Sequence, residues 1–285
     1  MTANIFVSLL QYVWEVVQMT FSFLVVSLGP LLVLATVMNF LAGRVERSSY
    51  RLMGPKVYLR LFGGLGTAAH ELGHAFFCKV FGHRITEMKL FSPDPASGTL
   101  GYVNHSYNPK SKYQQIGNFF IGIGPVITGS LLIYILAAIL IGVQPPSSYL
   151  PDSITASGNG IIQILADALK TSGYAAIGAF RDIFSGENWS SVWFYVFLYL
   201  VFAIGSSVTL SPADMKGARK GFLYLVVFLL VFNALTLWMG RFMNEVSIFF
   251  ARITGFMNAY ILLAAFLNLI FWGLMAGLSK VLRRP

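Results

Sequence analysis

The run GNFFIGIGPVITGSLLIYILAAILIG, residues 117–142, contains no Asp, Glu, Lys or Arg. A helix that crosses the hydrocarbon core of a bilayer needs roughly 20 consecutive, mostly apolar residues, and this run is long enough. The rest of the chain agrees, because 56% of its 285 residues are hydrophobic and only 11% are charged. Soluble domains carry about 25% charged residues. We therefore expect a protein embedded in a membrane.

Other runs share this apolar character. They lie at residues 16–42, 191–210, 221–240 and 258–279. We predict an all-α polytopic membrane protein with about five to six transmembrane helices. We expect it to form a single membrane-embedded domain covering residues 1–285.

Two longer segments separate the runs. In residues 83–116, the β-like pieces ITEMKLF and GTLGYVNHSY flank the turn-rich SPDPASG, which predicts a small β-hairpin region. Residues 143–190 are expected to form an outer loop. Within it, IIQILADALKTSGYAAIGAF has helical apolar spacing, and we predict an interfacial helix that lies on the membrane surface.

The basic residues indicate the orientation in the membrane. The formal net charge is +9, and in a membrane protein this is typical of cytoplasmic loops rather than of nucleic-acid binding. Residues 44–60 are expected to form a basic loop, and the other basic segments are 83–116, 211–220 and 280–285. All of them lie on the cytoplasmic side only if residues 61–82 enter the membrane and return. We expect this topology in the plasma (inner) membrane of a bacterium, with no nucleic-acid partner.

The stretch AAHELGHAF, residues 68–76, places two histidines and a carboxylate within residues 61–82, the segment expected to enter the membrane and return. Positions i and i+4 share one face of a helix, so His70 and His74 can bind one zinc ion. Glu71 lies beside them and could act as the general base for a water that the zinc activates. Ionisable groups within a membrane are costly, which makes them functional candidates by default.

A catalytic zinc site is expected to have a third protein ligand. The candidates are the acidic and histidine side chains after the motif: His83, Glu87, Asp94, His105 and Asp214. We favour Asp214, because Pro212 and the serines before it predict an interrupted helix end. Irregular backbone at membrane depth is tolerated where it is buried or lines a cavity. The simpler alternative is that Asp214 only caps the helix that follows.

Three elements, in this order, resemble motifs of the site-2 protease family of zinc intramembrane metalloproteases. They are AAHELGHAF, GIGPVITG at 122–129 and SPADMKG at 211–217. The resemblance covers roughly residues 60–220, so we expect a catalytic core of about 57–220. It implies His70, His74 and Asp214 as zinc ligands and Glu71 as the general base. The chain departs from the family pattern at Thr128, where the family commonly has Asn, and at Ala213–Met215, where it commonly has Leu-Asp-Gly.

The resemblance also suggests where a substrate binds. GTLGYV, residues 98–103, resembles the strand with which the family holds its substrate in extended form. We expect substrate-binding residues in or beside this strand and in the Gly-Pro motif: Gly101, Tyr102, Asn104, Gly124 and Pro125. An open strand edge can capture an unwound peptide by β-augmentation. The alternative is a hairpin that only closes over a loop.

Two functional hypotheses follow. The first is a zinc-dependent intramembrane endopeptidase that hydrolyses membrane-embedded or membrane-proximal proteins near the cytoplasmic face. The alternative is a non-proteolytic zinc-binding membrane protein or a transporter subunit. A structural zinc site is closed by four protein ligands, and no fourth ligand is well placed here, which favours catalysis. A transporter more often shows paired internal repeats, and the sequence shows none. The sequence does not indicate an oligomeric state.

Overall fold

The computed structural model describes residues 2–94, 98–143, 160–239 and 241–282. It is 82% helical with one small two-stranded sheet, which agrees with the predicted fold class. In chain order the elements are α1 (Thr2–Met53), α2 (Pro55–Tyr58), the π-helix η1 (Leu59–Gly63), α3 (Gly64–Val80), β1 (Arg84–Lys89), β2 (Tyr102–Ser106), α4 (Lys112–Ile141), α5 (Gly160–Ile183), η3 (Asn188–Ser190), α6 (Val192–Gly205), α7 (Pro212–Thr236), η4 (Leu237–Met239) and α8 (Arg241–Leu282).

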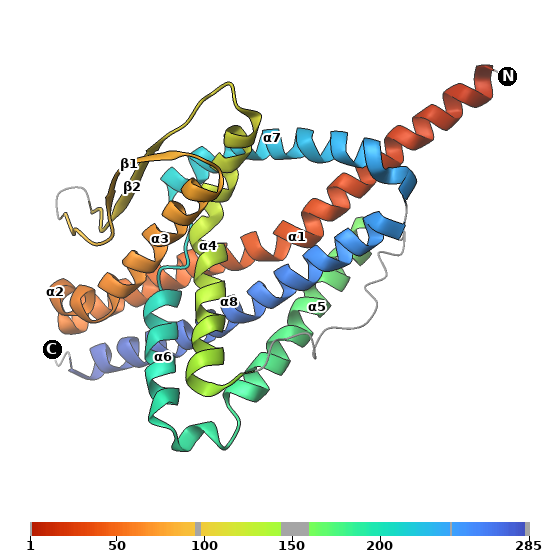
Figure 1. Ribbon diagram of the computed structural model, residues 1–285. Helices are drawn as coiled ribbons and strands as arrows, with labels where there is room; N and C mark the ends of the chain where they lie inside the picture. Colours follow the sequence, from red (N-terminus) through yellow and green to blue (C-terminus); the bar gives the residue numbers. More distant parts are fainter. Residues whose placement is uncertain (1, 95–97, 144–159, 240, 283–285) are drawn as a thin grey trace.

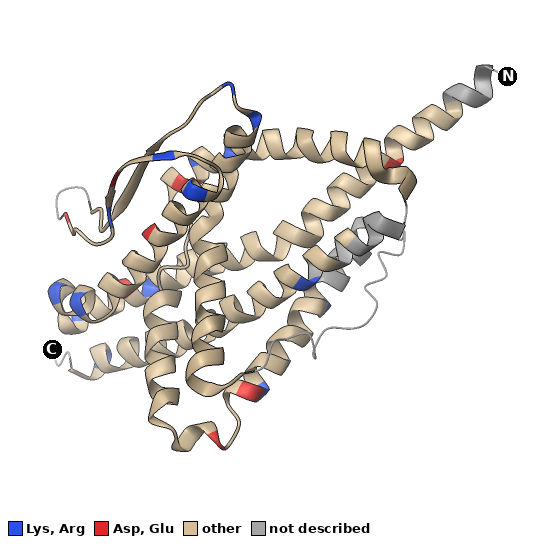
Figure 2. Ribbon diagram, in the orientation of Figure 1, with Lys and Arg blue, Asp and Glu red and all other residues tan. Residues whose placement is uncertain are grey.

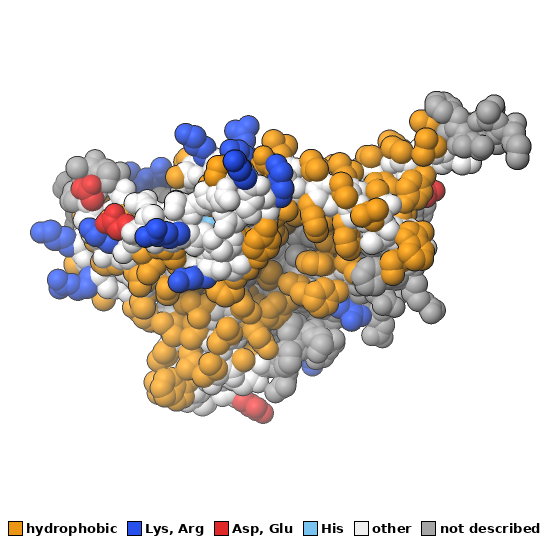
Figure 3. All heavy atoms as spheres, turned by 45° about the horizontal axis from the view of Figure 1, so that its top comes forward, with side chains coloured by type: hydrophobic (Ala, Val, Ile, Leu, Met, Phe, Trp, Pro, Cys, Tyr) orange, Lys and Arg blue, Asp and Glu red, His pale blue; other side chains and the backbone are white. Residues whose placement is uncertain are grey.

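Four helices of the described chain are long and apolar enough to cross a membrane. They span Val7–Met53, Lys112–Ile141, Pro212–Met239 and Arg252–Leu282. Apolar side chains cover much of the helical surface (Figure 3), as lipid contact requires. These helices indicate a membrane protein. The predicted number of spans is not confirmed, because α6 has only 14 residues.

The first helix is longer than the sequence pattern suggested. The predicted span at 16–42 lies within α1, which continues without a break to Met53. The prediction of a loop from residue 44 was therefore wrong. Arg is a good helix former, so the arginines from Arg44 onward end the apolar run of α1 but do not end the helix. The helix stops at Gly54, whose φ of 82° favours glycine, and Pro55 then begins α2.

α4 lies at the centre of the fold (Figure 1) and packs against α3, α6, α7 and α8. Glycines allow the closest of these approaches. A Cβ atom on Gly73 of α3 would lie 2.8 Å from Cα of Pro125, and one on Gly122 of α4 would lie 2.6 Å from the Asp214 carbonyl oxygen. Because these glycines have no side chain, α3 and the start of α7 can both lie against the same part of α4.

The predicted β-hairpin region is present. β1 and β2 pair antiparallel, with Arg84 opposite Ser106 and a register irregularity between Ile85 and Glu87. The segment before β2 lies over α3, since a Cβ atom on Gly101 would be 2.9 Å from Cγ of Glu71. The hairpin therefore covers the motif helix rather than projecting away from it.

The helix predicted within residues 143–190 is present as α5. It packs along α8, where Nδ2 of Asn258 donates a hydrogen bond to Oγ of Ser172 at 3.0 Å. Residues 144–159 of the predicted outer loop lie outside the described residues. The interfacial position of α5 and the return of residues 61–82 to the cytoplasmic side stay predictions.

Candidate metal centre

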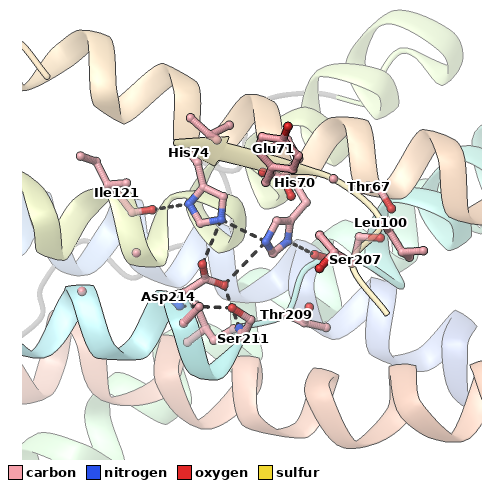
Figure 4. A pocket seen from close by; sticks show the side chains of 18 of the residues that line it. Thr67, His70, Glu71, His74, Leu100, Ile121, Ser207, Thr209, Ser211 and Asp214 are labelled. Carbon is pink, nitrogen blue, oxygen red and sulfur yellow. Dashed lines mark hydrogen bonds and ion pairs between the residues drawn. The ribbon is translucent and has the colours of Figure 1, made fainter. Parts of the chain in front are cut away.

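The histidine motif at residues 68–76 and the Asp214 motif at residues 211–217 meet in a cavity of about 810 Å³ (Figure 4). Its walls come from α1, α3, α4, the segment 98–105 and the stretch 206–217. The last of these contains the non-helical residues 206–211, which connect α6 to α7, and the first turns of α7. The predicted interruption before Asp214 is thus present and lines the cavity.

The two histidines come from successive turns of α3. Nδ1 of His70 lies 2.8 Å from the carbonyl oxygen of Ser207, and Nδ1 of His74 lies 2.8 Å from that of Ile121. A carbonyl oxygen can only accept, so both Nδ1 atoms carry the proton. In a neutral ring Nε2 is then a lone-pair acceptor. Backbone carbonyls of two other elements therefore fix both the ring orientation and the tautomer, as is usual for metal-binding histidines.

Asp214 faces these rings from the first turn of α7. Its Oδ1 lies 3.2 Å from Nε2 of His74, and its Oδ2 lies 3.7 Å from Nε2 of His70. The same carboxylate completes a capping box, because Ser211 N–H donates to Oδ2 at 2.8 Å and Ser211 Oγ accepts from Asp214 N–H at 3.1 Å. The helix cap is thus Ser211, and Asp214 takes part in capping while it faces the histidines.

The arrangement brings three acceptors to one point. Nε2 of His70 and Nε2 of His74 are 3.1 Å apart, although neither has a proton to donate in the neutral tautomer. Together with an Asp214 oxygen, these atoms lie within 4.8 Å of one another. Either a cation or an additional proton must hold them together. Two imidazole nitrogens and a carboxylate oxygen suit a transition-metal ion such as zinc, so the donor set fits a metal site.

Glu71 lines the same cavity but does not belong to the three-ligand group. Its side chain is only 7% exposed and packs against the segment at Gly101. The motif thus contributes two nitrogen atoms that could bind a metal ion and a separate buried carboxylate beside them.

The predicted substrate-binding residues fall into two groups. Gly101, Tyr102 and Asn104 line the cavity, and their contact with a substrate stays a prediction. Gly124 and Pro125 are buried and do not line it. A Cβ atom on Gly124 would lie 2.9 Å from the Gly73 carbonyl oxygen, so the structure places both residues in the α3–α4 packing contact instead.

The other candidate ligands do not belong to the three-residue group, although His105 lines the same cavity. Glu87 accepts a hydrogen bond from the Tyr102 hydroxyl, and Asp94 is exposed in its turn. Nε2–H of His83 donates to the Gln114 carbonyl oxygen at 2.9 Å, so His105 Nδ1–H donates to Nδ1 of His83 at 3.0 Å. Burial lowers the pKa of both histidines, and this neutral pair ties β2 to the start of α4.

Sequence reasoning did not identify the groups that orient the ligands. Ser211 and Asp214 have the S-x-x-D spacing that precedes an apolar run, a variant of the capping-box signature, so this contact had a detectable signal. No signal in the sequence marks the carbonyl oxygens of Ser207 and Ile121 as partners of the histidines. Every residue carries a carbonyl group, and only tertiary packing selects these two.

Comparison with protein-family models, with curated proteins and with solved structures found no match for this chain. The candidate metal site therefore rests on the geometry of its own residues, and the resemblance to the site-2 proteases stays a prediction.

Proposed function

We propose that this chain is a zinc-dependent intramembrane endopeptidase similar to the site-2 proteases. His70, His74 and Asp214 hold the zinc ion, and Glu71 is the general base. One observation carries the proposal: three proton-acceptor atoms converge in a cavity of an apolar helical protein, beside a buried carboxylate outside the ligand group.

The number of ligands supports catalysis over a structural role. Structural zinc sites are closed by four protein ligands, whereas catalytic sites have three and leave one position open. The group found in the described part of the chain has three members. The cavity of about 810 Å³ beside them leaves room for a peptide segment and water.

A bound zinc ion supplies Lewis-acid chemistry, which lowers the pKa of water and polarises a carbonyl group. The protein supplies the proton transfers. Glu71 accepts a proton from the attacking water and gives it to the leaving amine of the cleaved peptide bond. The carbonyl oxygens of Ser207 and Ile121 keep the two imidazole rings oriented throughout.

The position of the hairpin supports a peptide as the substrate. A peptide bond inside a helix has its carbonyl already paired, so hydrolysis needs an unwound segment. The stretch 98–105 lines the cavity next to the ligands and offers backbone groups for an extended chain. We propose that the substrate is a membrane-embedded or membrane-proximal protein cleaved near the cytoplasmic face.

The test compares wild type with Glu71→Gln and with Glu187→Gln, which removes an exposed carboxylate from another part of the chain. Each purified protein is incubated in detergent with a fluorescently labelled unstructured protein, and zinc content is measured in parallel. We expect Glu71→Gln to keep the metal and lose about 100- to 10,000-fold in cleavage rate, because it lacks the base. Glu187→Gln should cleave like wild type.

Two results would reject the proposal. One is cleavage by Glu71→Gln at the wild-type rate. The other is a zinc-loaded wild-type protein that cleaves no member of a panel of unstructured and transmembrane substrates, which would favour the non-proteolytic alternative.

A further inference from the structure

A second cavity, of about 700 Å³, lies between the C-terminal ends of α1 and α8, away from the metal centre. It is lined by Arg44, Arg47, Ser48, Arg51, Trp272, Ala276, Ser279 and Lys280. Four of these residues are cations and none is acidic. Figure 2 shows basic residues at this end of the molecule, where the last turns of α8 lie near the end of α1.

The described part of the chain provides no ion-pair partner for these cations. Within the described residues, none of the four forms an ion pair with Asp or Glu. The nearest acidic residue along α1, Glu46, instead lines the metal cavity. Like charges gathered around one cavity repel each other, so an anion in the cavity would stabilise this end of the protein.

Part of the cluster is held in place by its neighbours. The Arg44 guanidinium lies 4.7 Å from the ring centroid of Phe40 and 5.7 Å from that of Trp272. Nε–H of Arg47 donates to the Gly43 carbonyl oxygen at 2.8 Å. The remaining N–H donors of these guanidinium groups are free to bind oxygen atoms of a ligand, and their planar fork geometry suits phosphate.

The surface next to the cations is apolar. On α1, Val33, Val37 and Phe40 are exposed and precede Arg44, Arg47 and Arg51 at spacings of three or four residues. This spacing places all six on one helix face. On α8, exposed Leu269 precedes Trp272, Ala276 and Lys280 at the same spacing. A strip of apolar side chains therefore leads along both helices to the cationic cavity.

We propose that this cavity binds the phosphate headgroup of an anionic phospholipid, whose acyl chains lie along the apolar strip. Basic pockets between membrane helices are suited to anionic headgroups. A free phosphate ion would use the cations and leave the adjoining strip uncovered, whereas a phospholipid matches both. The site is separate from the metal centre and binds lipid whether or not the chain is a protease.

The test uses the full chain, delipidated in a nonionic detergent, with thermal unfolding as the measurement. Three ligands are titrated: phosphatidylglycerol, phosphatidylcholine with the same acyl chains, and glycerol phosphate without acyl chains. The variant Arg44→Gln/Arg47→Gln/Arg51→Gln removes three exposed cations from the cavity. Lys79→Gln/Arg84→Gln/Lys110→Gln removes three exposed cations from other parts of the chain and is the matched control.

Phosphatidylglycerol should raise the unfolding temperature of wild type and of the control variant at the same half-saturating concentration. Each lost charge should weaken binding about fivefold, so the cavity variant should need on the order of 100-fold more lipid. The other two ligands should have no such effect. If the cavity variant does not purify, Arg47→Gln and Arg51→Gln alone should each show the fivefold change.

The proposal is overturned if the cavity variants respond to phosphatidylglycerol like wild type. It is also overturned if glycerol phosphate stabilises the protein as well as the lipid does, which would identify a soluble anion site. An equal effect of phosphatidylcholine would show that the cations are not used.

Discussion

Replacing Ser211 by Ala tests whether the helix cap of α7 holds the metal ligand in place. The change removes Oγ, which accepts the Asp214 N–H, and leaves the Ser211 N–H that donates to Oδ2 of Asp214. Loss of a helix cap costs about 1 kcal/mol of stability, within a range of roughly 0.5–2. Partners that orient a metal ligand typically contribute about 10- to 100-fold to metal affinity. We expect the zinc affinity of Ser211→Ala to fall about tenfold.

The matched control is Ser111→Ala. Ser111 caps α4 by accepting from the Gln114 N–H, and it does not line the metal cavity. Both variants should lose a similar amount of stability in thermal unfolding, because each loses one cap. Zinc affinity is measured in detergent by competition with a chromogenic chelator. Unchanged affinity in Ser211→Ala, or an equal loss in both variants, would refute the idea that the cap positions Asp214.

Two further predictions concern the packing and the histidine pair. Gly122→Ala should lower the stability of the protein by about 1–3 kcal/mol and weaken zinc binding, since its Cβ would lie 2.6 Å from the Asp214 carbonyl oxygen. The control Gly277→Ala, whose Cβ would have nothing within 4 Å, should change neither stability nor zinc binding. Equal results for the two variants in thermal unfolding and chelator competition would contradict this prediction. Burial lowers the pKa of His83 and His105 in the folded protein, so at acidic pH the unfolded chain binds more protons than the folded one. The stability that this pair contributes should therefore be complete above about pH 6.5, the ordinary pKa of histidine, and should decrease as the pH drops below it. Thermal unfolding of metal-free protein between pH 7 and pH 5 should show a smaller fall in His105→Gln than in wild type, and equal falls would count against the buried pair.

The parts of the fold that depend on local patterns were predictable from the sequence. His70 and His74 are one turn apart on any helix, and the turn-rich segment between two β-like runs specified the hairpin. The interruption before Asp214 followed from Pro212. These features need only the chemistry of neighbouring residues, so a single sequence was sufficient.

The features that depend on packing were not predictable in the same way. An apolar run ends at its first charge, so it could not show that α1 continues through Arg44 to Met53. The motif around Gly124 and Pro125 indicated a site, whereas in the structure these residues pack against α3. Whether a glycine serves a ligand or a neighbouring helix depends on what lies opposite it, which is decided by the tertiary fold.

The most direct test of the central claim is the metal content of the purified chain. Elemental analysis is carried out on wild type, on Asp214→Asn and on Asp94→Asn, which changes an exposed aspartate outside the ligand group. We expect one zinc ion per chain in wild type and in Asp94→Asn, and a strong loss of zinc in Asp214→Asn. If wild type binds no metal after zinc is supplied, the three acceptor atoms are held together by a proton, and the metal site is rejected together with the proposed protease. If Asp214→Asn keeps its zinc, the three-ligand site is wrong.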